Sequence, residues 1–145
     1  MILQSQESYD ELIRLRKVVE LGTLMLLSER EDFDRTALQT ALENFEEACR
    51  EENPDAVKRL DRDIEFHNVL TRATGNRLLV EINDMINRLT YTSREKTIRK
   101  VIQDNQMDYL IRTHQRFADI ISQNDMQQFR DAVQDSFHYW KDIYK

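Results

Sequence analysis

Apolar residues recur at three- and four-residue steps through most of the chain, and this spacing places them on one face of an α-helix. The pattern predicts six helices, which begin near positions 8, 34, 54, 76, 106 and 126. It blurs between Tyr91 and Asn105, where we expect either a frayed end of the fourth helix or a linker. Gly22 lies inside the first predicted helix, at a cost of about 1 kcal/mol relative to Ala. A close helix crossing would explain it.

Residues that favour helix ends support these boundaries. Ser8-Tyr9-Asp10-Glu11 and Asp125-Met126-Gln127-Gln128 have the spacing of a capping box, and Asp34 is an N-cap candidate. Asn53-Pro54 predicts a cap followed by the first residue of the third helix. Gly75 is a typical left-handed terminator of that helix. The last helix is expected to run from Met126 through Trp140 to Tyr144.

Composition supports one all-α domain. The chain has 145 residues, of which 40% are hydrophobic and 33% charged, with only two Gly and one Pro. So few backbone breakers favour an all-α, antiparallel bundle of about six helices. A net charge of −6 argues against a phosphate-binding face, and a single cysteine, Cys49, excludes an internal disulfide. We expect Cys49 to be buried filler. Without a long apolar run or a signal peptide, a cytoplasmic protein with no membrane partner is expected.

One pair of residues suggests metal chemistry. Asp63 and His67 are four residues apart in the third predicted helix, so an oxygen and a nitrogen ligand can reach a common point. Such a pair suits zinc, nickel or manganese, provided that distant residues converge on it. The alternative is a solvated Asp beside a hydrogen-bonded His.

The other two histidines differ in their predicted surroundings. His114 lies on the apolar stripe of the fifth helix, where it is either a ligand or a core histidine bonded to a backbone carbonyl. His138 has Gln134, Asp135, Lys141 and Asp142 as helical neighbours, so helical phase places it on the polar side. Ser136 occupies the inward position nearby.

Three stretches resemble a known family. They are E-L-I-R-L-R-K-V-V-E from Glu11, D-R-D-I-E-F-H-N-V-L-T-R-A-T-G-N from Asp61, and T-H-Q-R-F-A-D-I-I from Thr113. Together they resemble the FCD effector domain of GntR-family bacterial transcription regulators, of the FadR subfamily. The resemblance extends from Ser8 to Tyr144. It implies a helical, usually dimeric domain whose cavity binds a small organic acid.

The resemblance also implies a metal site. In many family members a divalent ion, here expected to be zinc or nickel, is held by an Asp and a His that match Asp63 and His67. The third ligand matches His114. The fourth is a histidine of the last helix, and its register falls on Ser136, two residues before His138. His138 is therefore a ligand only if the last helix is irregular, and otherwise the site has three protein ligands.

An anionic effector needs a positive partner, because burial of an unpaired carboxylate is unfavourable. Arg16 matches a recurrent family arginine and could bind the acid, or it could form a salt bridge with Glu20. Arg94 is a second candidate, and Ser136 completes the predicted effector contacts.

These features predict a chain that is no enzyme. Residues 1–7 are expected to be a linker or an expression remnant, and residues 8–145 an FCD-like ligand-binding and dimerisation domain of a transcription regulator. Contact with DNA would need a winged helix-turn-helix domain preceding Ser8. Two alternatives remain open, a small metal-dependent hydrolase with Glu65 as its base and a helical interaction module with structural histidines.

Overall fold

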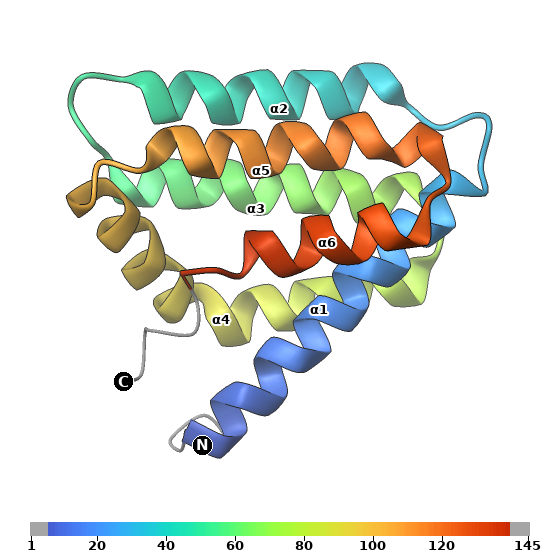
Figure 1. The fold of residues 1–145 in the computed structure, drawn as a ribbon, viewed down its shortest axis with the longest axis horizontal. Helices are drawn as coiled ribbons and strands as arrows, with labels where there is room; N and C mark the ends of the chain where they lie inside the picture. Colours follow the sequence, from blue (N-terminus) through green and yellow to red (C-terminus); the bar gives the residue numbers. More distant parts are fainter. Residues whose placement is uncertain (1–5, 140–145) are drawn as a thin grey trace.

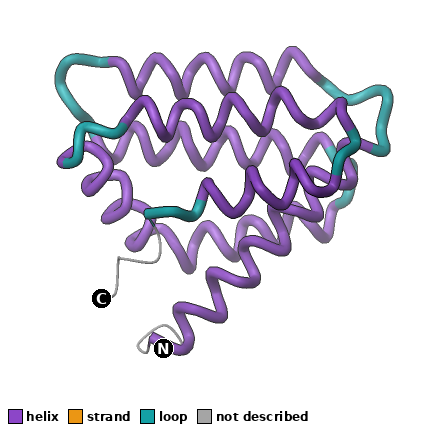
Figure 2. Tube along the Cα trace, viewed as in Figure 1, coloured by secondary structure: helices purple, strands orange, loops and turns teal. Residues whose placement is uncertain are grey.

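The computed structural model describes residues 6–139, which form an antiparallel helical bundle (Figures 1 and 2). Six α-helices and one short 3₁₀ turn account for its regular structure, and the described residues include no strand. The all-α prediction is confirmed. The elements are α1 (Gln6–Ser28), α2 (Arg35–Arg50), α3 (Ala56–Ala73), α4 (Arg77–Gln103), α5 (Met107–Ile120), η1 (Ile121–Gln123) and α6 (Met126–Ser136).

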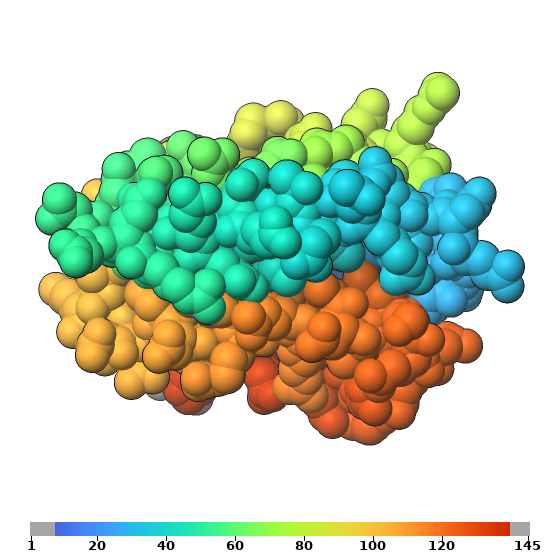
Figure 3. Space-filling view, turned by 90° about the horizontal axis from the view of Figure 1, so that it is seen from above, coloured from blue at the N-terminus to red at the C-terminus, as the bar shows by residue number. Residues whose placement is uncertain are grey.

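Helix α3 lies inside the bundle and positions the candidate site. It packs against α2, α4 and α1, while α5 packs against α2 and α6. Figure 3 shows α2 and α5 side by side over one face of the molecule, and Figure 1 shows α1 and α4 on the opposite side. The main apolar core lies between α1, α2, α3, α5 and α6, around the fully buried Phe66, Phe117 and Phe129. No described helix is long and apolar enough to cross a membrane.

Several predicted helix ends are confirmed. The Asp34 carboxylate accepts a hydrogen bond from the Ala37 amide, and Asp125 accepts from the amides of Gln127 and Gln128. Each side chain thereby satisfies amides that have no partner within the first turn. Gly75 has a φ of +72°, as expected of a left-handed terminator.

Two predicted helix starts are wrong. Helix α1 has already begun at Gln6, so Ser8 lies within it and is not its N-cap. Helix α3 starts at Ala56, where the Asp55 side chain accepts a hydrogen bond from the Lys58 amide. Asp55 therefore takes the capping role that we assigned to Asn53.

The last two helices differ from the prediction at their C-terminal ends. Helix α5 ends at Ile120 and tightens into the 3₁₀ turn η1 up to Gln123. Helix α6 ends at Ser136, with Phe137 as its C-cap, and does not continue as one helix towards Tyr144. Trp140 and Tyr144 lie outside the described residues.

The blurred stretch after Tyr91 is helical and forms the second half of α4, which extends to Gln103. Several of its polar residues are buried, and the Thr90, Ser93 and Thr97 hydroxyls are satisfied there by donating to carbonyls of the preceding turn. Hydroxyls bonded in this way commonly bend a helix. Figure 1 shows α4 changing direction along its length.

Candidate metal and effector site

Asp63, His67 and His114 come together in the interior of the bundle. Asp63 and His67 lie one turn apart on α3, and His114 reaches them from α5. Asp63 Oδ1 lies 3.2 Å from His67 Nε2 and 2.7 Å from His114 Nε2. The three side chains are buried, and each offers one ligand atom within 4.8 Å of the others. The structure therefore brings a residue that is distant in sequence, His114, to the Asp63–His67 pair, which is the condition that we set for a metal site.

Aromatic side chains fix the two imidazole rings. Phe45 of α2 stacks on His114, with ring centroids 4.0 Å apart, and Phe66 lies 5.0 Å from the same ring. Phe66 and Phe117 present edge contacts to His67. Because these residues belong to the apolar stripes of three helices, the same packing that forms the core also orients the histidines.

The outer nitrogen of each histidine faces an oxygen acceptor. His114 Nδ1 lies 2.8 Å from the Leu110 carbonyl oxygen, and His67 Nδ1 lies 3.2 Å from Glu20 Oε1. A carbonyl only accepts, so His114 Nδ1 carries a proton. Metal-binding histidines commonly have their other nitrogen held in this way. In this structure Nε2 of both rings faces Asp63 Oδ1, and a bound ion would take the place of the Nε2 proton. The donor set of one carboxylate and two imidazoles therefore fits a divalent ion.

Arg94 completes the surroundings of Asp63. Its guanidinium donates to Asp63 Oδ2 at 2.9 Å and to Asn87 Oδ1 at 2.7 Å, and its side chain is 2% exposed. Burial acts to raise the pKa of Asp63. The Arg94 charge and the hydrogen bonds from His114 and His67 outweigh this effect and hold the pKa well below its ordinary value. Asp63 is therefore ionised, with Oδ1 facing the histidines.

A cavity adjoins this group and contains both predicted effector arginines. Arg16 and Arg94 line it together with Ser136, and apolar side chains such as Ile98 and Phe137 form other parts of its wall. Arg94 Nε is buried without a hydrogen-bond partner among the described residues. The cavity thus combines buried positive charge with an apolar wall, which suits a small organic anion.

Arg16 forms the salt bridge with Glu20 that we considered, and it also lines the cavity. Its guanidinium lies 3.5 Å from Glu20 Oε1. Burial, together with the nearby Arg94 charge, lowers the pKa of Arg16 to about 10. Two guanidinium groups on one cavity wall repel each other, so an anion between them would be favourable.

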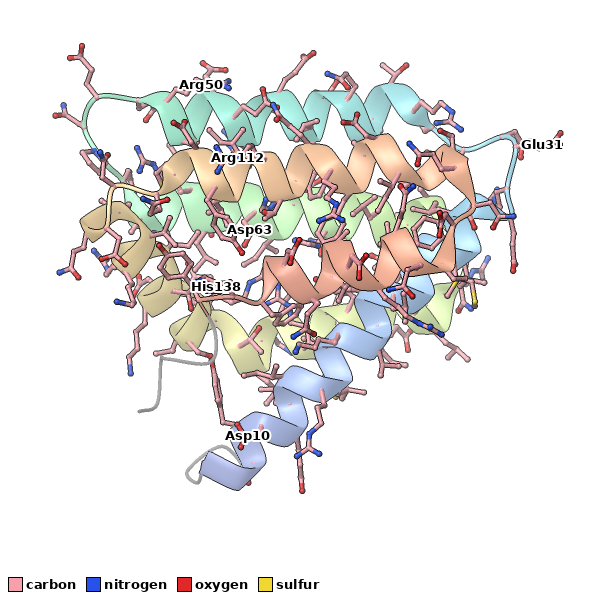
Figure 4. All side chains as sticks on the ribbon, in the orientation of Figure 1. Asp10, Glu31, Arg50, Asp63, Arg112 and His138 are labelled. Atoms are coloured by element: carbon pink, nitrogen blue, oxygen red, sulfur yellow. The ribbon has the colours of Figure 1, made fainter. Side chains whose placement is uncertain are left out.

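The structure does not bring His138 to this group. His138 is exposed beyond the end of α6, where its ring lies 6.1 Å from that of Tyr109 in a surface groove between α5 and α6. Figure 4 shows His138 and Asp63 on different elements. Ser136 lines the cavity and donates a hydrogen bond to the Val133 carbonyl. Glu65, the base that a hydrolase would need, is exposed and pairs with Arg72.

Sequence reasoning missed two residues that support the site. Glu20 was considered only as a partner for Arg16, yet it also faces His67. Asn87 was not singled out, although it accepts from Arg94 and donates to Asn68 on α3. The only available signal was position, since Asn87 is one turn from Asn83 and two turns from Arg94 on the inward face of α4.

Comparison with known proteins agrees with this geometry. The family model described as FCD domain matches residues 11–138, which include every residue of the site. No curated protein matches the chain significantly. FCD domains are regulatory, effector-binding domains and often bind a metal ion. Because the match spans most of the sequence, the chain belongs to the FCD domain family.

Proposed function

We propose that the chain is the effector-sensing domain of a GntR-family transcription regulator, which binds a small carboxylate together with a divalent metal ion. The observation that supports this most directly is the convergence of Asp63, His67 and His114 beside a cavity that contains two buried arginines. Three protein ligands leave positions open for an effector or water. Zinc or nickel suits the mixed nitrogen and oxygen donor set best.

Different residues of the chain would bind the metal ion and the effector. Asp63, His67 and His114 would hold the ion, and Glu20 and the Leu110 carbonyl would orient the two rings through Nδ1. A bound ion would act as a Lewis-acidic anchor for the effector carboxylate. Arg16 and Arg94 would donate hydrogen bonds to the acid, and the apolar wall would exclude water from it.

Signal transfer would proceed through α1. Glu20 and Arg16 on this helix contact or adjoin the site, so occupancy of the cavity favours one placement of α1 over another. A DNA-binding domain joined to the N-terminus would be connected through the same helix. The effector shifts such an equilibrium only by its difference in affinity for the two placements.

Metal content is the first test of this proposal. Elemental analysis of protein purified without a histidine tag should give close to one ion per chain for the wild type. His114→Ala should lose the ion because it removes a ligand, and His138→Ala should retain it because that residue is exposed away from the site. Circular dichroism checks that both variants are folded.

A thermal-shift screen with small mono- and dicarboxylates tests the effector. Acids that bind should raise the melting temperature of the wild type, and Arg16→Met should weaken this response. A protein that takes up no metal after soaking and that no carboxylate stabilises would contradict the proposal. The histidines would then be structural, as in the interaction-module alternative.

A further inference from the structure

Two tyrosines separate the interior cavity from the surface groove between α5 and α6. Tyr109 of α5 and Tyr139, three residues beyond the end of α6, line both the cavity and the groove. No other described residue lines both of them. The centroids of the two tyrosine rings lie 5.7 Å apart, with the ring planes at 50°. The two side chains therefore form the boundary between the groove and the cavity.

The residues that follow α6 cover the cavity on this side. Phe137 and Tyr139 line the cavity, although α6 ends at Ser136. Figure 1 shows this part of the chain running from the end of α6 to the second half of α4. There the Tyr139 hydroxyl donates a hydrogen bond to the carboxylate of Asp104, the C-cap of α4. Phe137 is buried in the main core and fixes the start of the segment, so Tyr139 is the part that can move.

Few contacts hold this boundary closed. The Tyr109 hydroxyl donates to the Asp135 carbonyl in the last turn of α6. Burial raises the pKa of Tyr109 to about 12, so the donor keeps its proton. Arg116 pairs with the Asp135 carboxylate at 2.6 Å, but the two side chains are 38% and 61% exposed, and exposed ion pairs contribute little to stability. These contacts can therefore break without the unfolding of a helix.

The groove carries the positive charge that favours the entry of an anion. Arg112 and Arg116 line it, and Asp135 is the only acidic side chain among its described lining residues. Arg16 and Arg94 line the cavity on the other side of the tyrosines. Positive charge at the mouth of a cleft concentrates anions there and raises their rate of association. An anion that passes from the groove to the cavity would leave one pair of guanidinium groups for another.

We propose that small anions enter the cavity from the groove between α5 and α6, through a passage that Tyr109 and Tyr139 open and close. Tyr109 limits what can pass, because its ring lies on the boundary and its hydroxyl holds the end of α6. The inference rests on the proposed function only for the identity of the anion as an effector carboxylate. Access to the cavity can be measured without metal or effector, so each proposal can fail without the other.

A cysteine placed in the cavity measures this access. Ile98 is 3% exposed and lines the cavity, so the thiol of Ile98→Cys reports reagents that have passed the tyrosines. The probe is the anionic 2-sulfonatoethyl methanethiosulfonate, and mass spectrometry follows its reaction with each thiol. Tyr109→Ala should raise the reaction rate at position 98 roughly tenfold or more, because opening no longer requires loss of the Asp135 contact. Tyr109→Phe, which keeps the ring but not the hydroxyl, should raise it less.

Two matched controls separate a passage from a general loosening of the fold. Cys49 is buried beside Ile111 of α5, outside the cavity lining, and should react at the same slow rate in every variant. Tyr91→Ala removes a tyrosine that is 37% exposed on α4 and lines neither the groove nor the cavity, so it should leave both rates unchanged. No acceleration at position 98 in Tyr109→Ala, or equal acceleration of Cys49, would overturn the proposal.

A reagent of opposite charge tests the role of the groove. The cationic 2-(trimethylammonio)ethyl methanethiosulfonate is similar in size to the anionic reagent. Arg112→Glu should slow the anionic reagent several-fold at position 98 and accelerate the cationic one, because it reverses a charge at the mouth of the passage. Arg88→Glu, exposed on α4 outside the groove, makes the same change in net charge and should alter neither rate. An equal response of both reagents to Arg112→Glu would mean that anions enter elsewhere.

The outcomes for the passage and for the proposed function can be told apart. Faster labelling in Tyr109→Ala, in a protein that binds neither zinc nor a carboxylate, would support the passage and contradict the proposed function. Zinc and carboxylate binding, together with labelling that Tyr109→Ala leaves unchanged, would support the proposed function and overturn the passage.

Discussion

At the scale of single residues, the Asp63 carboxylate connects the metal candidates with the effector candidates. Its Oδ1 faces both histidines, and its Oδ2 accepts from Arg94. Arg94 in turn lines the cavity. One buried carboxylate therefore faces both the guanidinium and the place that a bound ion would occupy, and it offsets part of their positive charge. Neither half of the site can change without an effect on the other.

Glu20→Gln should weaken metal binding without removing a metal ligand. The Glu20 carboxylate faces His67 Nδ1, where it orients the ring, and such partners typically contribute 10- to 100-fold in metal affinity. Titration of metal-free protein with zinc in the presence of a competing chelator measures the change. Glu11→Gln, exposed on the same helix, is the control and should leave the affinity as it is. Equal affinities for wild type and Glu20→Gln would show that Glu20 has no such role.

Gly75→Ala should destabilise the fold by roughly 1–2 kcal/mol, because a Cβ is unfavourable in the left-handed region. Gly75 has a φ of +72°, and an added Cβ would lie 2.6 Å from Arg30 Nη1. That same nitrogen donates to the Ala73 carbonyl at the end of α3, so relief of the clash would cost this hydrogen bond. Urea unfolding followed by circular dichroism measures the difference.

Asn105→Gly is the matched control for Gly75→Ala. Asn105 also has a positive φ, of 54°, and Gly adopts this conformation without strain. We expect this variant to be close to neutral. A Gly75→Ala protein as stable as the wild type would mean that the turn between α3 and α4 relaxes around the new side chain.

At the scale of whole elements, α4 shows where sequence reasoning was insufficient. Helices with a clear apolar stripe, such as α2 and α5, were placed correctly to within a few residues. The buried face of α4 is mainly polar, with Asn87 and Arg94 bonded to partners on the same helix and on α3. A periodicity of hydrophobic residues does not detect such a face, because its polar groups are satisfied only in the folded bundle.

The same limit applies to the site. Helical spacing predicted that Asp63 and His67 share a face, as the structure also shows. Helical phase placed His138 off the site, and the structure leaves it there because α6 ends at Ser136, before His138. The approach of His114 followed only from family resemblance, since it depends on how α5 packs against the rest of the bundle. Glu20 was missed because its contact with His67 joins two residues that are 47 positions apart in sequence and belong to different helices.

Cys49 gives a test of the packing between α2 and α5. It is buried beside Phe45 and Ile111, and burial raises the pKa of its thiol to about 12. The folded pKa exceeds the unfolded value near 9, so ionisation in the unfolded chain lowers the free energy of unfolding as pH rises above 9. Cys49→Ala should remove this part of the alkaline destabilisation, measured by urea unfolding at pH 8 and pH 10.

The thiol of the folded protein should also react slowly with Ellman's reagent at pH 8 and rapidly in urea. Rapid reaction without denaturant would show that the interface between α2 and α5 opens readily. A small exposed thiol standard in the same buffer gives the reference rate.

At the scale of the whole molecule, α1 contacts the site on one face and exposes apolar residues to solvent on the other. Arg16 and Glu20 face the site, whereas Val18 and Met25 are exposed. A Cβ added at Gly22 would meet nothing within 4 Å, so the close helix crossing expected there is absent among the described residues. The helix contacts α3, α4, α6 and η1, while Figure 1 shows its N-terminal half extending away from the other helices. A change at the cavity that moves Glu20 therefore also moves the exposed side of α1, because both belong to the same helix.

Hydrogen exchange can measure this connection directly. Addition of zinc should slow exchange of amides in α3 and α5, which hold the ligands, and also in the part of α1 around Glu20. In Glu20→Gln, measured at zinc concentrations that saturate the variant, protection of α3 and α5 should persist while that of α1 decreases. Helix α2 supplies the internal reference, because it offers no metal ligand.

Unchanged protection of α1 in Glu20→Gln would mean that core packing, and not the contact between Glu20 and His67, carries the effect of the metal to α1. Equal exchange of α1 with and without zinc in the wild type would contradict its role in signal transfer, since a helix that does not respond to the site has nothing to pass on to a domain joined to it.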